Sequence, residues 1–319
     1  MSELLELRGL TVKLPTPAGW IAPVNEVSLR VTASEALGLV GESGSGKTML
    51  SLALMGLLPT GARTSGDVQF GGKNLLGLSE REWRDVRGGE IAMVFQEPMT
   101  SLNPVMRVGE QIEEGILAHT NGTGNSRDAV EKKMLDALRL AAVPEPEVRA
   151  QQFPHQLSGG LRQRVMIAMA LAMGPKLLIA DEPTTALDVT VQKQILDLLD
   201  RLRRELQLGL LFITHDLGVV AQVAERVAVM YAGRIVEEGP VKDVLARPRH
   251  PYTQGLLAAS PTLERGKLSP IPGTVPQLTE LPPGCAFEPR CSFRLAECSM
   301  AMPELRVAGP EHKARCVLV

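Results

Sequence analysis

The chain has 319 residues, which is enough for one large α/β domain with a sizeable core and a smaller appendage. Its formal net charge is −2 and 3% of its residues are aromatic, which argues against a basic nucleic-acid-binding face and against a base-stacking surface. No apolar run approaches the roughly 18 residues of a membrane span, and the N-terminus lacks the features of a secretory signal. We therefore expect a cytosolic protein whose membrane association comes through partner subunits.

The first third of the chain combines an antiparallel β pattern with a glycine-rich loop. Residues Leu4 to Val31 alternate apolar and polar residues, and Ala36–Val40 is a short apolar strand. The GxxxxGK[ST] motif of a phosphate-binding loop follows directly, and an apolar helix is expected at Met49–Leu58. Its glycines let backbone N–H groups converge on phosphate oxygens, while a lysine and a hydroxyl serve the phosphates and Mg²⁺. The residues of this loop are Gly41, Glu42, Ser43, Gly44, Ser45, Gly46, Lys47 and Thr48.

The middle of the chain changes from strand to helix patterns. Ser79 and Glu82 form a capping box that opens a short helix. Ile91–Phe95 is a buried strand that ends at Gln96. Residues 102–157 are helical, with a polar break at residues 121–125.

Residues 157–188 hold three chemically different pieces in a row. A turn of small residues, Ser158-Gly159-Gly160, feeds a helix, and such a helix N-terminus attracts phosphate. Leu177–Ala180 is a strand buried on both faces that ends in Asp181 and Glu182. The third piece, Pro183–Asp188, is a turn-rich link into the next helix. Carboxylates at the carboxyl end of a buried parallel strand lie where open α/β sheets place their ligand chemistry.

Beyond Asp188 the α/β alternation continues. An amphipathic helix runs from Val191 to Leu206, with Gly209 as its expected end. Leu210–Ile213 is a further buried strand that ends near His215, and residues 226–238 predict a hairpin.

All four cysteines lie in the Pro-rich C-terminal part of the chain. In a cytosolic protein such clustering favours a metal site over disulfides. Four cysteines suit either tetrahedral Zn²⁺ or a [4Fe–4S] cluster, and their spacing does not choose between them. The residues are Cys285, Cys291, Cys298 and Cys316.

Residues 157–188, together with the phosphate loop, Phe95–Pro98 and Thr214–Asp216, resemble the motifs of the ATP-binding cassette (ABC) ATPases. The resemblance implies an α/β fold with a P-loop NTPase (RecA-like) core, an antiparallel β subdomain and an inserted helical subdomain at about 97–175. It places the ATPase domain at residues 1–250 and a small Cys-rich extension at 251–319.

The resemblance also implies roles in ATP hydrolysis. Glu182 is the candidate general base, His215 contacts the γ-phosphate, and Gln96 reaches Mg²⁺ and the attacking water. In this family the signature turn covers the nucleotide held by a second subunit, so that two chains sandwich each ATP. The Mg²⁺ ligands implied are Thr48, Gln96 and Asp181, and the further nucleotide-contacting residues are Ser158, Gly159, Gly160, Gln163 and Asp188. The position that usually carries an adenine-stacking aromatic matches Leu14, and Trp20 is the only aromatic nearby, so the adenine contact stays open.

Three segments extend the resemblance to the dipeptide/oligopeptide (and nickel) importer ATPases: Glu97–Pro104, Arg249–Thr253 and Leu281–Cys285. The similarity runs nearly end to end. It implies peptide uptake, and a location on the cytoplasmic face of the inner membrane. The implied partners are two membrane permeases, a second and often non-identical ATPase subunit, and an extracytoplasmic peptide-binding protein. For the four cysteines it favours a [4Fe–4S] cluster, with Zn²⁺ or reduced thiols as alternatives.

Other functions remain as alternatives. The same ATPase could drive import of nickel or another small solute, because the ATPase never touches the cargo. A DNA-repair ABC ATPase would carry a long coiled coil, and a ribosomal one would carry two cassettes in one chain; neither feature is present in this sequence. A purely regulatory nucleotide-binding module would be expected to lack Glu182 or the signature.

Overall fold

The computed structural model describes residues 3–120, 126–260 and 269–319. The chain forms two compact units, Met1–Gly77 with Phe212–Val319 and Leu78–Leu211, and the division falls within strand β8 (Gly209–Thr214). The polar break predicted at residues 121–125 lies outside the described residues.

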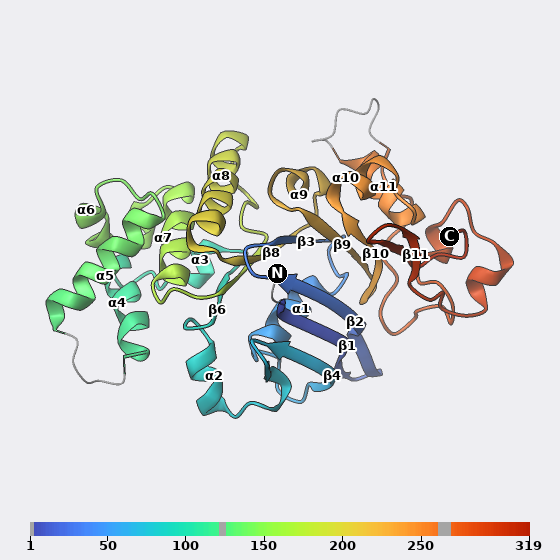
Figure 1. Ribbon diagram of the computed structural model, residues 1–319, viewed down its shortest axis with the longest axis horizontal. Coiled ribbons are helices and arrows are strands. Elements are labelled where there is room, and N and C mark those ends of the chain that lie inside the picture. The colour runs from blue at the N-terminus through green and yellow to red at the C-terminus, as the bar shows by residue number, and fades with distance from the viewer. Residues whose placement is uncertain (1–2, 121–125, 261–268) are drawn as a thin grey trace. The chain divides into compact units, whose positions relative to one another are not determined.

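The first unit contains a four-stranded antiparallel sheet in the order β2-β1-β4-β5 (Figure 1). The middle of its apolar face is fully buried, with Leu10, Val12, Val24 and Val27 at 0% exposure. The antiparallel β region predicted for residues 4–31 is therefore confirmed as a long hairpin of two strands. The strands are β1 (Glu3–Thr16), β2 (Gly19–Thr32), β4 (Arg63–Phe70) and β5 (Lys73–Asn74).

A second sheet in this unit has the order β11-β12-β10-β9-β3-β8. Strand β3 lies parallel to β9, and its five residues are all buried, as a continuous apolar run predicts. The predicted hairpin at 226–238 is confirmed: β9 and β10 turn at Ala232 and Gly233, which both have positive φ (43° and 85°). The strands not yet bounded are β3 (Ala36–Val40), β9 (Arg226–Tyr231), β10 (Arg234–Pro240), β11 (Arg306–Gly309) and β12 (His312–Ala314).

Helix α1 (Lys47–Leu54) follows β3 and is shorter than the predicted 49–58. It begins inside the glycine-rich loop, and the chain leaves the helix at Gly56, whose φ is 62°. The Leu57 N–H donates to the Leu52 carbonyl at 2.8 Å, an i→i−5 bond that closes the helix end.

A buried carboxylate fastens the C-terminal part of the chain to β10. Glu237 is 0% exposed and accepts from the backbone N–H groups of Arg249 (2.7 Å) and His250 (2.9 Å). Its Oε1 also lies 2.7 Å from Nε2 of His312 on β12. Because these bonds compensate for its lost hydration, the carboxylate organises the segments after β10 around itself. Those segments include α10 (Val241–Ala246), α11 (Pro251–Ala259) and the 3₁₀ turns η3 (Glu288–Arg290) and η4 (Ala296–Ser299), and the unit's other short elements are η1 (Leu75–Gly77) and α9 (Leu217–Val223).

The second unit contains parallel strands β6 (Ile91–Val94) and β7 (Leu177–Asp181) and most of the long helices (Figure 1). The capping box predicted for Ser79 and Glu82 is confirmed at the start of α2. Among the described residues, no helix is both long and apolar enough to cross a membrane. The helices are α2 (Glu80–Val86), α3 (Pro98–Ser101), α4 (Val108–Ala118), α5 (Arg127–Leu140), α6 (Pro146–Ala150), η2 (Pro154–Gln156), α7 (Gly159–Leu171) and α8 (Val189–Leu206).

The predicted end of α8 at Gly209 is wrong. The helix ends at Leu206, because its C-cap Gln207 adopts a left-handed conformation with φ 53°. The Leu208 N–H donates to the Arg203 carbonyl at 2.9 Å, which closes the helix end. Gly209 already belongs to β8, because its N–H donates to the carbonyl of Lys176 at 2.9 Å.

His250 generates a pH prediction for stability. Burial, helped by nearby Arg315, lowers the pKa of His250 to about 3, from the 6.5 expected in an unfolded chain. Between pH 6.5 and pH 3, His250 is therefore protonated in the unfolded chain and neutral in the folded chain. Stability from this residue is fully present above pH 6.5 and is lost as the pH falls towards 3.

Because of His250, we expect the free energy of unfolding to be about 2 kcal/mol lower at pH 5 than at pH 7.5. Urea unfolding at both pH values checks this against His250→Asn, which keeps a side-chain acceptor at the N-cap of α11. The variant should lose less stability than the native chain over this interval, and an equal loss would contradict the assignment.

Candidate functional site

The loop between β3 and α1 has a shape that excludes side chains at two of its glycines. A Cβ on Gly41 would lie 2.2 Å from the Met230 carbonyl oxygen and 2.7 Å from the Ser45 Oγ. Gly46 has a φ of 106°, and a Cβ there would lie 2.0 Å from the Pro23 carbonyl oxygen. The backbone therefore packs where only glycine fits, as a loop that presents N–H groups to an anion requires.

Lys47 is oriented along this loop. Its side chain is almost buried, and Nζ donates to the carbonyl oxygens of Gly41 (2.7 Å) and Glu42 (3.0 Å). Ser43, Gly44 and Thr48 are exposed, whereas Ser45 is fully buried. The loop therefore offers an ammonium group and an exposed hydroxyl at the N-terminus of an eight-residue helix, a combination suited to phosphate.

Two residues that the sequence did not single out hold Glu42. The Tyr252 Oη accepts from the Glu42 N–H at 2.7 Å, and Arg290 donates to both carboxylate oxygens of Glu42. Tyr252 belongs to the segment Arg249–Thr253, which carried the family resemblance. That resemblance was the only feature of the sequence that pointed to Tyr252. Nothing in the sequence around Arg290 marked it.

His215 also lies in the first unit, directly after β8, which is the sheet neighbour of β3. Its side chain is exposed. The next residue, Asp216, caps α9 by accepting from the Gly218 N–H at 2.8 Å, and it also accepts from the Ser260 hydroxyl at 2.8 Å. The chain direction immediately after His215 is thus fixed by hydrogen bonds on its C-terminal side.

In the second unit, Gln96 and Glu182 follow the parallel strands β6 and β7, and the structure brings them together. The Gln96 Nε2 donates to the Glu182 Oε2 at 3.3 Å, and the Thr185 hydroxyl donates to the same oxygen at 2.9 Å. Glu182 has a φ of 47°, an uncommon conformation for a residue other than glycine and one that often marks functional sites. Asp181, the last residue of β7, is 2% exposed.

The Ser-Gly-Gly turn begins α7 as predicted. Ser158 is the N-cap and accepts from the Leu161 N–H, while a Cβ on Gly160 would lie 2.7 Å from the Val191 side chain. Gln163 lies on the buried side of α7. Asp188 is the N-cap of α8 and accepts from the Val191 N–H at 2.9 Å, so its side chain has a structural role.

The four cysteines line one narrow cavity of about 10 Å³ in the first unit, together with His250 and Phe287, and all four are free thiols. Burial raises the pKa of Cys285 to about 11 and also raises the pKa values of Cys291 and Cys316. Without a metal these three thiols are therefore protonated at neutral pH. In the described part of the chain, no three His, Cys, Asp or Glu side chains are grouped as ligands for one metal ion.

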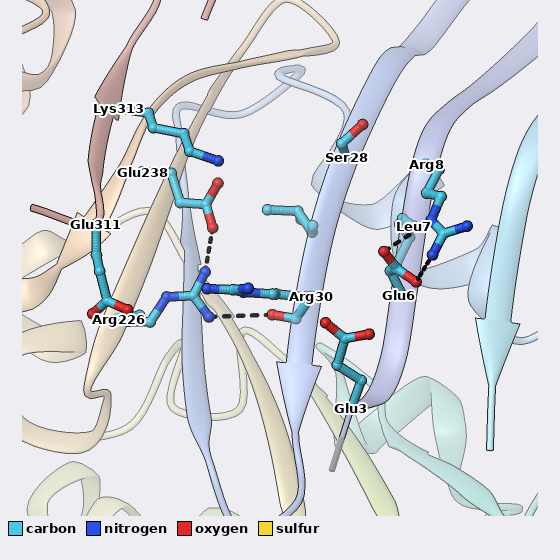
Figure 2. Close-up of a pocket in the computed structure, with 11 residues that line it drawn as sticks. Glu3, Glu6, Leu7, Arg8, Ser28, Arg30, Arg226, Glu238, Glu311 and Lys313 are labelled. Atoms are coloured by element: carbon cyan, nitrogen blue, oxygen red, sulfur yellow. Dashed lines mark hydrogen bonds and ion pairs between the residues drawn. The ribbon is translucent and has the colours of Figure 1, made fainter. Parts of the chain in front are cut away.

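A separate pocket of about 280 Å³ in the first unit is lined by charges of both signs (Figure 2). Arg226 pairs with Glu238 and also donates to the Arg30 carbonyl, while Arg8 pairs with Glu6. Since much of its charge is balanced internally and none of the predicted site residues lines it, we do not assign nucleotide chemistry to this pocket.

Trp20, the aromatic considered for adenine stacking, is 47% exposed. The Arg63 guanidinium lies 4.4 Å from its ring centroid, so one face of the ring is already covered by a cation–π contact.

Comparison with known proteins covers the whole chain. Residues 24–185 match the ABC transporter family, and residues 236–298 match the oligopeptide/dipeptide transporter C-terminal region. The oligopeptide transport ATP-binding protein OppD of Bacillus subtilis is 52% identical, over 92% of this chain and 83% of its own length. The dipeptide transport ATP-binding protein DppD of the same organism is 46% identical, over 100% of this chain and 95% of its own.

Solved structures agree on the fold. A dimeric structure of an ATP-binding cassette in a post-hydrolysis state bound to ADP and Pi matches with a TM-score of 0.67 and 30% identity. The match covers 75% of this chain and 99% of that one. With its phosphate loop between β3 and α1 and its near full-length relatives, the chain belongs to the ABC transporter family, among the oligopeptide and dipeptide transport ATP-binding proteins.

Proposed function

We propose that this chain is the ATP-hydrolysing subunit of an ABC importer that powers uptake of dipeptides or oligopeptides across the cytoplasmic membrane. The observation that carries the proposal is the geometry of residues 41–48, in which two glycines pack where no side chain fits and a buried lysine lies along the loop. The chain is also 46–52% identical to named peptide transport ATP-binding proteins.

The phosphate loop would bind the nucleotide. The backbone N–H groups of the loop and the Lys47 ammonium would contact the β- and γ-phosphates, so that residues 41–48 would surround the triphosphate. Thr48, Gln96 and Asp181 would hold Mg²⁺; their oxygen donors suit this cation, and when bound it neutralises charge on the phosphates. The exposed hydroxyl of Thr48 and the strand-end position of Asp181 support these roles.

Glu182 would act as the general base that orients and deprotonates the attacking water, and His215 would contact the γ-phosphate. The bonds from Gln96 and Thr185 support this role, because they fix the rotamer of a carboxylate whose backbone is already held in an unusual conformation. Phosphoryl transfer needs placement and charge stabilisation and no covalent nucleophile, so these groups suffice.

Glu182→Gln should abolish hydrolysis while ATP binding persists. We expect turnover to fall about 100-fold or more, since the amide cannot accept the proton of water. The ATP affinity should stay within about threefold, because the variant keeps the shape and hydrogen bonding of the side chain. Phosphate release and equilibrium ATP binding measure the two effects, and size-exclusion chromatography with ATP should show a nucleotide-bound dimer accumulating.

Glu205→Gln is the matched control, since Glu205 is an exposed carboxylate on α8 that pairs only with Arg201 among its described contacts. It should hydrolyse ATP at the native rate. Undiminished turnover in Glu182→Gln would refute the assignment of the base.

The signature residues Ser158, Gly159 and Gly160, with Gln163 and Asp188, would complete the nucleotide site of a second ATPase subunit. A dimeric cassette among the similar structures supports this arrangement. The chain would then sit at the cytoplasmic face of the membrane, bound to two permeases and served by an extracytoplasmic peptide-binding protein. In this proposal residues 1–250 form the ATPase domain, with a helical subdomain at about 97–175, and residues 251–319 form the extension.

Cargo is tested through the partners. Affinity-tagged chain is used to isolate its permeases and the associated binding protein, whose affinity for dipeptides, longer peptides and Ni²⁺ is then measured. Binding of peptides supports the proposed cargo. Binding of Ni²⁺ alone would assign the same ATPase to metal uptake.

We also propose that the four cysteines hold a [4Fe–4S] cluster, with Zn²⁺ as the alternative. Their convergence on one cavity and their lack of disulfides support a shared ligand. The donor set fits such a group, but a cavity of about 10 Å³ does not hold it as arranged, so binding requires the thiols to move apart and ionise.

Anaerobically purified protein should therefore be brown, with an absorbance band near about 400 nm and about four irons per chain. Cys298→Ala should lose the band, whereas Met300→Ala, an exposed neighbour, should keep it. A colourless, zinc-loaded sample would rule the cluster out, and a colourless, metal-free sample would leave reduced thiols.

A further inference from the structure

The phosphate loop carries one carboxylate, Glu42, and the C-terminal region supplies its counter-ion. The Arg290 Nη1 lies 2.7 Å from the Glu42 Oε2, and Nη2 lies 3.0 Å from Oε1. The side chain of Arg290 is 4% exposed and that of Glu42 is 29% exposed. A bidentate pair with one partner buried is geometrically defined, unlike a mobile surface ion pair.

Contacts within the C-terminal region and with Tyr231 hold the Arg290 side chain in place independently of its pair with Glu42. Its Nε donates to the Pro272 carbonyl at 2.8 Å, and its guanidinium carbon lies 5.9 Å from the Tyr231 ring centroid and 5.8 Å from that of Phe287. The hydrogen bond with Glu42 is the main cause that raises the pKa of Arg290 above its usual value. The phosphate loop therefore lies against the guanidinium of Arg290, which is permanently charged and already oriented.

A second contact holds the backbone of the same residue. The fully buried Tyr252 accepts from the Glu42 N–H at 2.7 Å, and its ring packs against Tyr231 at 4.5 Å and Phe287 at 5.4 Å. Tyr252 and Arg290 therefore hold one loop residue by its main chain and its side chain from a single aromatic cluster.

The charge at Glu42 matters because the loop's ligand is a polyanion. A carboxylate built into a phosphate-binding loop repels the phosphates, and a guanidinium held against it cancels that repulsion. The same pair directs the carboxylate towards the C-terminal region.

We propose that Arg290 and Tyr252 are positioning residues for ATP binding: Arg290 neutralises and orients Glu42, and Tyr252 fixes its backbone. This inference rests on the proposed function of the phosphate loop. It makes the C-terminal region a requirement for tight ATP binding by this chain.

The test is a charge-removal cycle on the full-length chain, with ATP affinity measured by isothermal titration calorimetry. Arg290→Met should weaken ATP binding about tenfold, because the Glu42 charge is left uncompensated. The double variant Glu42→Gln with Arg290→Met should return to within about threefold of the native affinity, since both charges are gone. A double variant as weak as Arg290→Met would mean that Arg290 only supports packing, and native affinity in Arg290→Met would overturn the proposal.

Two further variants guard against a folding artefact. Arg290→Lys keeps the charge but loses the bidentate geometry, so it should bind ATP within about threefold of native protein. An affinity as low as that of Arg290→Met would contradict charge compensation. Arg294→Met is the matched control, because Arg294 is 65% exposed in the same region and its ion pair with Glu288 is long at 3.7 Å; it should bind ATP normally.

Tyr252→Phe tests the backbone contact separately. Loss of the hydroxyl leaves the Glu42 N–H without this acceptor, and we expect the KM for ATP to rise about threefold with kcat unchanged. An unchanged KM would remove Tyr252 from the proposal.

Lys47→Ala separates this inference from the function it rests on. If the loop binds ATP, this variant should lose binding altogether. Native binding by Lys47→Ala would refute the proposed function, whereas loss in Lys47→Ala beside native binding in Arg290→Met would refute the inference alone.

Discussion

Close backbone packing around residues 41–48 is the constraint on which the first unit depends. Gly41 and Gly46 lie against the carbonyl groups of Met230 and Pro23, closer than any side chain would permit. The turn of the β9–β10 hairpin secures this approach, since the Gly233 N–H donates to the Ser45 carbonyl at 2.9 Å and its own carbonyl accepts from the Asn25 N–H at 2.8 Å. The shape of the loop is therefore set by strands far from it in sequence, and the glycines of the motif are as much a packing requirement as a phosphate-binding one.

The C-terminal region completes the first unit through two carboxylates. Glu237 is buried, and backbone N–H groups from the segment before α11 and the ring of His312 from β12 surround it. Glu42 is met by a tyrosine and an arginine from the same region. A carboxylate without such donors would be costly at either place, so removal of the C-terminal region would affect much more than the cysteines it carries.

Local patterns predicted most of the elements, and long-range contacts account for what they missed. The β1–β2 hairpin, the buried strands and the β9–β10 turn follow from periodicity and turn residues, which act over a few positions. The end of α8 does not follow from local patterns, because the Gly209 N–H bonds to the Lys176 carbonyl and Gly209 belongs to strand β8. The partners of Glu42 lie 210 and 248 residues away, and no local signal exists at that separation. The roles of Glu182 and His215 in hydrolysis remain predictions from resemblance, supported by position.

The two loop glutamates show what the sequence could not distinguish. Both follow a buried parallel strand, Glu42 two residues after β3 and Glu182 one residue after β7. The contacts of Glu182 include an amide and a hydroxyl, which orient its carboxylate. Glu42 instead meets a guanidinium, which removes its charge from the field around the loop. A residue in a phosphate-binding loop must not repel the phosphate. The guanidinium partner therefore distinguishes Glu42 from Glu182 in a way that the residue type and its position after a strand do not.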